Sequence, residues 1–348
     1  MTSRLAFAYP GNLELKTGGY GYDREIIAGL KQLGWDIELI PLGEGFPSPS
    51  SSVLTEAERR LSALPEGMLV MIDGLAFGVM DEWAKREEKR LKLVALVHHP
   101  LALETGVGES DQCRLRESER DALGTTQHVF VTSPMTAREL IENFAVPESK
   151  LSVAVPGTAK PLKSPKRQNE VPKILSVGSL TRRKGHDILI ASLAGILDLS
   201  WQATIIGSPH LDPSIASALE EQITALGLND RVALAGECED LAPAYAEADI
   251  FALASRYEGY GMVFAEALSY GLPIVACHAG AVPEVVPSDA GFLVPMDDIE
   301  AVASALRTLL TDPDHRARTA EAAASAGTKL PTWTDTSTII SNRLKELI

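Results

Sequence analysis

Short apolar runs alternate with amphipathic stretches along the whole chain. The first run, residues 4–9, has the length of a buried strand, and residues 23–33 then carry apolar side chains at helical spacing before Gly34. Further strands are predicted at residues 36–41, 68–72, 93–97 and 129–132, and further helices at residues 81–91 and 136–144. Strands that alternate with helices in this way predict a parallel sheet covered by helices on both faces.

The alternation is interrupted at residues 153–173 and then begins again. This segment contains four prolines and has little apolar periodicity, which is typical of a linker between domains. Beyond it, strands are predicted at residues 173–177, 202–206, 231–235, 249–254 and 273–276, and a helix follows Lys184. We therefore expect an α/β protein with two Rossmann-like, doubly wound domains, residues 1–160 and 161–330, that face each other across a cleft.

The charge of the chain is acidic in both halves. The 348 residues include 32 basic and 47 acidic side chains, which gives a net charge of −15. Residues 1–165 contribute 18 basic and 23 acidic side chains, and residues 166–348 contribute 14 and 24. This balance argues against nucleic acid as a partner, because neutralising phosphates requires a basic surface.

The cysteines and the apolar runs bear on the expected location. Cys113, Cys238 and Cys277 are far apart and odd in number, so they match neither a disulfide framework nor a metal site. The first residues lack the apolar core of a signal peptide, and no apolar run has the length of a membrane span. We expect a cytoplasmic protein. Residues 84–92 are basic on balance and leave open a weak, peripheral attachment to the inner face of the membrane, although a solvated helix face is the favoured interpretation.

The segment SRYEGYGMVFAEALSYGLPIVA, residues 255–276, places Glu258 and Glu266 around a glycine-bearing turn. A helix is predicted from Met262, and the free N–H groups and positive dipole at its start favour an anion. Ionised carboxylates only accept hydrogen bonds, so they suit sugar or ribose hydroxyls that flank a phosphate. Taken alone, Glu266 is more typical of a solvated helix residue, and Glu258 fits a structural role as well as a binding one.

A second segment, VGSLTRRKGHDILI at residues 177–190, is also a strand, a turn and a helix. It brings Arg182, Arg183 and Lys184 to the turn before a helix N-terminus, an arrangement that suits a pyrophosphate. The alternative is a solvated basic loop. A local cationic cluster is nevertheless unusual in a half that carries 14 basic and 24 acidic side chains.

Glycines near the N-terminus lie between a predicted strand and a predicted helix. Gly18, Gly19 and Gly21 are followed at once by Asp23 and Arg24, so the stretch does not match the dinucleotide fingerprint G-x-G-x-x-G. A nicotinamide enzyme is therefore disfavoured. We expect the glycines to let this loop approach a ligand that is held mainly by the other half.

His98 and His99 follow the strand at residues 93–97, at an edge of the sheet where ligands bind. Adjacent histidines point in different directions, so one of the two is expected to face the ligand. Asp312 and Asp314 have the D-x-D spacing of some metal sites. They follow a predicted helix, however, and are interpreted as its stop and as the cap of the next helix.

Taken in order, these segments resemble the family 4 glycosyltransferases, which have the two-domain fold called GT-B. The glycine stretch near residue 18 is similar to that family's GG loop, and VAVPGT, residues 153–158, to its crossover between the domains. VGSLTRRKGHD is similar to its phosphate-binding segment, and residues 255–276 to its signature of two glutamates separated by seven residues. HAGAVPEVV and AGFLVP continue the pattern. The resemblance covers nearly the whole chain and implies that residues 331–348 form a helix that returns towards the first domain.

The resemblance implies a retaining hexosyltransferase that takes its sugar from a nucleotide diphosphate sugar, with a UDP-sugar as the first expectation. No cofactor and no metal are expected. Lys184 and Arg183 would hold the diphosphate, Glu266 the ribose hydroxyls, and His98 would lie near the transferred sugar and the acceptor. The implied donor site comprises Gly18, Gly19, Arg183, Lys184, Glu258, Gly259, Tyr260, Gly261, Met262, Val263 and Glu266, and the implied catalytic residues are His98, Lys184 and Glu258.

The mechanism favoured for this family fits the cationic cluster. The leaving phosphate takes the acceptor proton on the same face of the sugar, and a cationic clamp stabilises the charge that develops on the diphosphate. The two glutamates then need not act as nucleophile and proton donor, as they would in a glycosidase. Two positions depart from the family pattern: Ser179 stands where an arginine is common, and Ala279–Gly280 stands where two glycines are common.

Other functions remain open at this point. A nucleotide-sugar epimerase or a glycoside phosphorylase could use the same fold, and so could a non-catalytic protein that binds nucleotide sugars. The acceptor is not encoded in any motif, so a lipid, a saccharide and a small aglycone all remain candidates.

Overall fold

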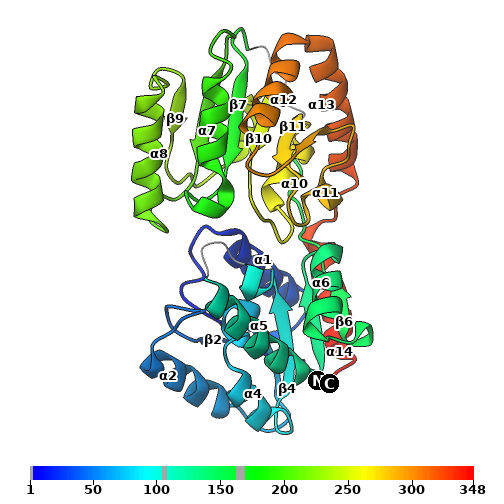
Figure 1. Ribbon diagram of the computed structural model, residues 1–348. Helices are drawn as coiled ribbons and strands as arrows, with labels where there is room; N and C mark the ends of the chain where they lie inside the picture. The colour runs from blue at the N-terminus through cyan, green and yellow to red at the C-terminus, as the bar shows by residue number, and fades with distance from the viewer. Residues whose placement is uncertain (1–2, 104–107, 162–168) are drawn as a thin grey trace. The chain divides into compact units, whose positions relative to one another are not determined.

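The computed structural model describes residues 3–103, 108–161 and 169–348. The chain forms two compact units, the first made of Met1–Gly157 and Pro331–Ile348 and the second of Thr158–Leu330 (Figure 1). The sequence predicts boundaries after residues 160 and 330; the structure divides after Gly157 and after Leu330, so only the second boundary coincides. The predicted linker at residues 153–173 falls partly outside the described residues. Each unit is an α/β structure on one parallel sheet, so the predicted fold class is confirmed.

The first unit is built on six parallel strands in the order β2-β1-β3-β4-β5-β6. The strands are β1 (Arg4–Tyr9), β2 (Asp36–Pro41), β3 (Leu69–Asp73), β4 (Lys92–Val97), β5 (His128–Val131) and β6 (Leu151–Val153). The helices are α1 (Gly18–Gln32), α2 (Ser51–Ser62), α3 (Gly74–Phe77), α4 (Asp81–Glu87), α5 (Glu109–Gly124), α6 (Pro134–Phe144) and α14 (Trp333–Lys345), with 3-10 turns η1 (Leu101–Leu103) and η2 (Glu148–Lys150). The strand order reverses between β1 and β3, which is where ligands bind in open α/β sheets.

Helix α1 begins five residues earlier than predicted, at Gly18 instead of residue 23. The Thr17 side chain caps it by accepting the N–H of Tyr20, and Tyr22 and Asp23 are buried in the second turn. Gly18 and Gly19 therefore lie in the first turn of a helix and not on a loop before it. The prediction missed this start because two adjacent glycines are poor helix formers.

The last helix, α14, packs against α1 within the first unit (Figure 1). Three buried or half-buried polar contacts fix it: Trp35 Nε1 donates to Ser341 Oγ at 2.8 Å, Thr336 Oγ1 donates to the Val155 carbonyl at 2.7 Å, and Lys92 Nζ donates to the Leu347 carbonyl at 2.7 Å. The first unit is thus completed by residues from both ends of the sequence.

The second unit is built on six parallel strands in the order β12-β11-β10-β7-β8-β9. The strands are β7 (Lys173–Val177), β8 (Gln202–Ile206), β9 (Val232–Leu234), β10 (Ile250–Leu253), β11 (Ile274–Cys277) and β12 (Gly291–Val294). The helices are α7 (His186–Ala194), α8 (Pro213–Ala225), α9 (Ala242–Glu247), α10 (Met262–Ser269), α11 (Val282–Val285), α12 (Ile299–Thr311) and α13 (Pro313–Thr328), with the 3-10 turn η3 (Arg182–Lys184). The order reverses between β7 and β10, so this is the switch point of the sheet.

The D-x-D stretch has the structural role that the sequence predicts for it. Asp312 follows α12, and its carboxylate accepts the N–H of His315 at 2.8 Å as the cap of α13. Asp312 therefore follows the last residue of α12 and caps the start of α13, so its carboxylate has a structural role.

Basic side chains of the stretch at residues 84–92 pair with acids on the same helix and on neighbouring helices. Lys85 Nζ lies 3.0 Å from Asp121 Oδ2 and 3.3 Å from Asp81 Oδ2, and Arg86 Nη2 lies 2.6 Å from Glu58 Oε2. This pairing favours a solvated helix face, and attachment to a membrane surface stays a prediction. Within the described residues, the helices are too short or too polar for any of them to cross a bilayer.

Glu119 on α5 is a buried carboxyl that has a hydrogen-bond partner at one of its two oxygens among the described residues. Its Oε2 accepts the N–H of Leu101 at 2.9 Å, whereas Oε1 has no partner among the described residues. Burial raises the pKa of Glu119 to about 8. Between its ordinary pKa and about 8, Glu119 keeps its proton in the folded protein but loses it in the unfolded chain. The free energy of unfolding therefore falls as the pH rises through this range.

Glu119→Gln mimics the protonated form and removes the titration. We expect the free energy of unfolding of this variant, relative to wild type, to rise by about 3–5 kcal/mol between pH 4.5 and pH 8. Denaturant unfolding at a series of pH values measures the difference, and Glu117→Gln, on the exposed side of the same helix, is the matched control. A pH-independent difference would contradict the assignment of a neutral Glu119.

Candidate active site

Two segments that the sequence singles out follow the neighbouring strands at the switch point of the second sheet. β7 is followed by Gly178 and the turn η3, and β10 is followed by Ser255 and Glu258. Because β7 and β10 pair in parallel, their carboxyl ends lie at the same edge. Strand order thus brings together two stretches that are about 75 residues apart in the sequence.

Lys184, Arg183 and Glu258 form one cluster at this edge. Lys184 Nζ donates to Glu258 Oε1 at 2.6 Å, and Arg183 Nη1 lies 3.5 Å from Glu258 Oε2. Ser255 Oγ donates to the same Oε1 at 2.6 Å, and Arg183 Nη1 also donates to the Tyr257 carbonyl at 3.0 Å. Arg182, in contrast, has an exposed side chain, so Arg183 is the arginine that joins Lys184 in the cluster.

The two cations determine the ionisation of Glu258. The carboxyl is buried, and burial alone would raise the pKa of Glu258. The charges of Lys184 and Arg183 outweigh this effect and hold the pKa below its ordinary value. The cluster therefore contains two cations and one carboxylate at neutral pH, and it keeps an excess of positive charge for an anion.

At two glycines near the cluster, the neighbouring backbone leaves no room for a Cβ atom. Gly185 has φ +64°, and a Cβ there would lie 1.9 Å from the Ala254 carbonyl oxygen. Gly280 has φ +54°, and a Cβ there would lie 2.2 Å from the Glu258 carbonyl oxygen. Glycine at these two positions lets the turn after β7 and the loop after β11 approach the loop after β10.

Arg256 holds the same loops together with its side chain. It donates to both carboxylate oxygens of Asp187 at 3.0 and 2.8 Å, and to Asp297 Oδ1 at 2.7 Å. Its Nη1 also donates to the Arg182 carbonyl at 2.5 Å. The bidentate pair joins the start of α7 to the loop after β10, and so it supports the position of Lys184.

Helix α10 begins beside the cluster, as predicted from the sequence. Gly261 precedes it with φ +92°, and no side chain caps the helix among the described residues. Met262 and Val263 form its first turn, and Gly259 and Tyr260 lie on the loop that leads into it. The N–H groups of this first turn are suited to an anion.

Glu266 lies in the second turn of α10 and is half-buried, so it differs from the solvated helix residue that it would be if taken alone. Its Oε2 accepts the hydroxyl of buried Tyr245 at 2.7 Å. Burial raises the pKa of Glu266, and the Tyr245 hydrogen bond opposes this rise. Tyr245, which the sequence did not suggest, fixes one oxygen of this carboxyl.

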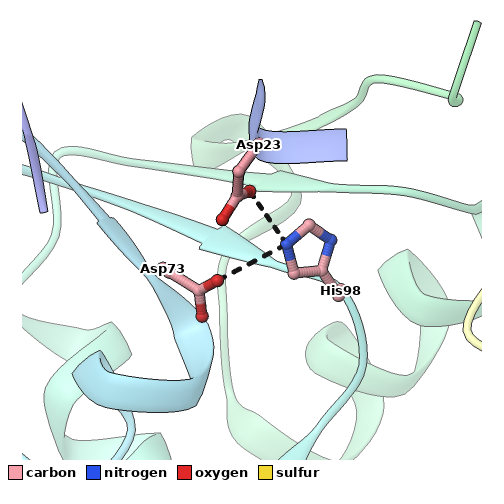
Figure 2. A group of neighbouring side chains, drawn as sticks. All are labelled: Asp23, Asp73 and His98. Atoms are coloured by element: carbon pink, nitrogen blue, oxygen red, sulfur yellow. Dashed lines mark hydrogen bonds and ion pairs between the residues drawn. The ribbon is translucent and has the colours of Figure 1, made fainter. Parts of the chain in front are cut away.

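In the first unit, His98 meets two buried carboxyls that the sequence analysis did not select (Figure 2). Its Nε2 lies 3.1 Å from Asp23 Oδ1 and 3.6 Å from Asp73 Oδ2. The three side chains come from α1, from the end of β3 and from the residue after β4. Both carboxyls are buried, whereas the His98 side chain is 18% exposed, so the imidazole is the member that a ligand can reach.

The three side chains shift one another's ionisation. Burial alone would lower the pKa of His98, but the charge and hydrogen bond of Asp23 and the hydrogen bond of Asp73 outweigh it and raise the pKa to about 10. Burial and the nearby Asp73 raise the pKa of Asp23 to about 7, and Asp73 itself is kept ionised because its pKa is lowered by His98 against the effect of burial. These shifts favour a protonated imidazole beside an ionised Asp73, while Asp23 takes up a proton near pH 7.

The same three side chains have the spacing of a metal-binding group. One ligand atom from each lies within 4.8 Å of the others. A pair of carboxylates and an imidazole is also what several divalent cations accept. The geometry thus fits either an imidazolium between two carboxylates or a cation held by all three.

The predicted site residues therefore fall into two groups, one in each unit. Lys184, Arg183 and Glu258 are in contact in the second unit, and α10 with Glu266 begins beside them. In the first unit, a Cβ at Gly19 would lie 3.4 Å from the His98 ring, whereas one at Gly18 would meet nothing within 4 Å. Gly19 thus lies against His98, and Gly18 does not.

Comparison with solved structures shows the class of fold. The two parallel, doubly wound units are those of the GT-B fold. The structure matches that of sucrose-phosphate synthase from Thermosynechococcus elongatus with a TM-score of 0.84 and 21% identity over 99% of both chains. It matches Anabaena HepE in complex with UDP-glucose with a TM-score of 0.76 and 20% identity, over 98% of this chain and 99% of that one.

Sequence comparisons bear mainly on the second unit. Residues 160–326 match the family model described as "Glycosyl transferases group 1", and this match covers most of the second unit. The chain is also 31% identical over 156 residues to the lipopolysaccharide core biosynthesis mannosyltransferase LpsB of Rhizobium meliloti. That match covers 42% of this chain, and it spans less than half, 43%, of LpsB.

Proposed function

We propose that the protein is a retaining hexosyltransferase of glycosyltransferase family 4, which moves a sugar from a nucleotide diphosphate sugar to a hydroxyl acceptor without a metal ion. The observation that carries this proposal is the cluster of Lys184, Arg183 and Glu258 at the switch point of the second sheet. Two cations beside one buried carboxylate and a helix start offer both charge for a diphosphate and an acceptor for sugar hydroxyls. The match of residues 160–326 to the group 1 glycosyltransferase model supports it.

Each part of the cluster has a role in the proposed reaction. Lys184 and Arg183 bind the diphosphate, together with N–H groups of Met262 and Val263 at the start of α10. Glu258 accepts hydroxyls of the donor sugar, and Glu266 accepts those of the ribose. Glu266 has one oxygen on Tyr245, so its other oxygen is the one for the ribose.

The chemistry follows from the placement of charge. The bond between the anomeric carbon and the diphosphate breaks, and negative charge develops on the leaving oxygen, where Lys184 and Arg183 stabilise it. The acceptor oxygen forms its bond on the same face, and its proton passes to the leaving phosphate. Configuration is retained, and neither glutamate acts as nucleophile.

A uridine nucleotide is our first candidate for the donor, and a UDP-glucose complex of the structurally similar HepE is known. At a concentration about 100 times its Kd, the correct nucleotide sugar is expected to stabilise the protein by about 2.7 kcal/mol. That corresponds to a rise in the melting temperature of roughly 5–10 °C for a domain of this size.

A thermal-shift screen of UDP-, GDP- and ADP-sugars tests this expectation, with the free sugars as controls. A donor that passes is then incubated with candidate acceptors, and release of the nucleoside diphosphate reports transfer or slow hydrolysis. Proton NMR of the anomeric centre in the product shows whether configuration is retained. If none of the nucleotide sugars raises the melting temperature, the proposed donor class is wrong.

A further inference from the structure

Arg256 uses its guanidinium to hold segments that follow three different strands of the second sheet. Its Nη1 and Nη2 donate to the two carboxylate oxygens of Asp187, in the first turn of α7, at 3.0 and 2.8 Å. Its Nη1 also donates to the Arg182 carbonyl in η3 at 2.5 Å, and its Nε donates to Asp297 Oδ1, in the loop after β12, at 2.7 Å. One side chain on the loop after β10 therefore contacts the segments that follow β7 and β12.

The strand order explains why a side chain is needed for this connection. β12 and β7 are separated in the sheet by β11 and β10, so among the described strands no pairing joins their ends. The main chain of Arg256 adds a bond to the same turn, because its N–H donates to the Arg183 carbonyl at 2.8 Å. Arg256 thus binds two consecutive carbonyls of η3, the turn that ends at Lys184.

Asp297 has a backbone conformation that is unusual for a residue with a side chain. Its φ is +58°, in the left-handed region that glycine favours and that aspartate and asparagine adopt more readily than other residues do. Its carboxylate lies 2.7 Å from Arg256 Nε, although the side chain is 56% exposed. An ion pair with a partner this exposed adds little stability. The strained backbone and the weak pair together favour a functional role for this contact.

The guanidinium of Arg256 has little capacity left for a ligand. Of its five N–H groups, four donate to two carboxylates and one main-chain carbonyl. Arg256 faces two carboxylates, whereas Lys184 and Arg183 share a single one. The positive charge in excess therefore lies at Lys184 and Arg183, and an anion is expected there and not at Arg256.

We propose that Arg256 is a positioning residue for the diphosphate site, and that it fixes the turn η3 so that Lys184 and Arg183 are in place before the donor binds. This inference rests on the proposed transferase function for the identity of the ligand. The planar fork of the guanidinium is essential to the role, because it holds both oxygens of Asp187 and still reaches a carbonyl and a second carboxylate. Without it, the turn must be ordered when the donor binds, and affinity is lost.

The affinity for a nucleoside diphosphate is the main test, measured by calorimetry with UDP and, in parallel, with ADP and GDP. We expect Arg256→Gln to raise the Kd of the nucleotide that wild type binds by about 10- to 100-fold, since a misplacement of about 1 Å has effects up to this size. Arg256→Lys keeps the charge but loses the fork, and its Kd should stay raised by about 10-fold. Wild-type affinity in Arg256→Lys would overturn the proposal.

Arg307→Gln is the matched control. Arg307 donates to both carboxylate oxygens of Asp198 at 2.6 and 2.7 Å, and Asp198 lies in the same unit but after the end of α7. This variant loses the same kind of bidentate pair away from the turn η3, so its Kd should equal that of wild type. Equal losses of affinity in Arg307→Gln and Arg256→Gln would show that general destabilisation is the cause, which contradicts a positioning role.

Asp187→Asn separates positioning from direct contact with the diphosphate. Asparagine has nearly the shape of aspartate, so this variant is expected to fold even if Arg256→Gln does not. If Arg256 positions the turn, Asp187→Asn raises the Kd as Arg256→Gln does, because the bidentate pair is lost in both. If Arg256 contacts the diphosphate itself, Asp187→Asn releases a cation for it. Unchanged or tighter binding in Asp187→Asn therefore overturns the proposal.

Hydrogen exchange measures the order of the turn without any ligand. The amides of Lys184 and Gly185 donate to main-chain carbonyls of Thr181 and Arg182 at 3.1 and 3.3 Å, so their exchange reports the opening of η3.

We expect these amides to exchange at least about 10-fold faster in Arg256→Gln than in Arg307→Gln, because local opening becomes easier when the turn loses its partner. Equal exchange in the two variants would overturn the proposal. If wild type binds neither a nucleoside diphosphate nor a nucleotide sugar, the proposed function fails, while hydrogen exchange still decides whether Arg256 fixes the turn.

Discussion

Replacing Lys184 by Met is expected to lower kcat/KM for glycosyl transfer by about 100- to 1,000-fold, since removing one preorganised donor to a developing charge has effects of this size. Lys184 Nζ lies 2.6 Å from Glu258 Oε1, so the variant loses a cation for the diphosphate and leaves a buried carboxylate with weaker compensation. The pKa of Glu258 should rise as a result. Kinetics at saturating and limiting donor separate a loss in kcat from a loss in binding.

Two companion variants separate chemistry from stability. Lys173→Met removes a cation of the same type from an exposed pair with Glu247, where the side chains are 41% and 67% exposed, and should change activity little. Lys184→Met combined with Glu258→Gln removes the uncompensated buried charge, and should recover stability without recovering activity. An unchanged kcat/KM in Lys184→Met would show that the cluster does not bind the diphosphate. If the protein only binds nucleotide sugars, the wild type itself will show no turnover, and Lys184→Met will weaken binding alone.

Gly185→Ala is expected to destabilise the second unit by about 3–5 kcal/mol, from the strain of a positive φ together with overpacking. The added Cβ would lie 1.9 Å from the Ala254 carbonyl oxygen, which belongs to the loop after β10 and has little freedom to move. The turn that carries Lys184 must then shift. The thermal midpoint measured by calorimetry should fall by roughly 10 °C.

Gly227→Ala is the matched control for this prediction. Gly227 has φ +67°, close to the +64° of Gly185, but a Cβ there would meet nothing within 4 Å. We expect this variant to lose only about 1 kcal/mol, from the left-handed backbone alone. If the two variants lose the same stability, the contact with Ala254 is not what requires glycine at position 185.

Much of the fold follows from periodicity. The buried strands β1, β3 and β4 are apolar runs bounded by turns, and parallel pairing follows because helices separate them. Two helices lack the composition of a typical helix over their whole length and were harder to predict. α5 carries many charged residues, and α1 begins with two glycines.

The candidate site was predicted unevenly, for a physical reason. Glu258 and Lys184 stand in segments with turn residues and charges that indicate binding by themselves. Asp23 and Asp73 do not, because each is a single acid among ordinary neighbours, and they meet His98 only through the order of strands β1, β3 and β4. Arg256 was missed in the same way, since its partner Asp187 lies 69 residues away. Local sequence contains no information about such contacts until the strand order is known.

The packing of α14 on α1 sets the order in which the two units can be completed during synthesis. Every residue of the second unit, Thr158–Leu330, has been made before the ribosome reaches α14. The first unit contains the earliest residues of the chain, yet the partner that buries one face of α1 is translated after all of them. The unit that begins second is therefore the first whose whole sequence has been synthesised, and a nascent chain that ends before residue 331 lacks the helix that completes the first unit.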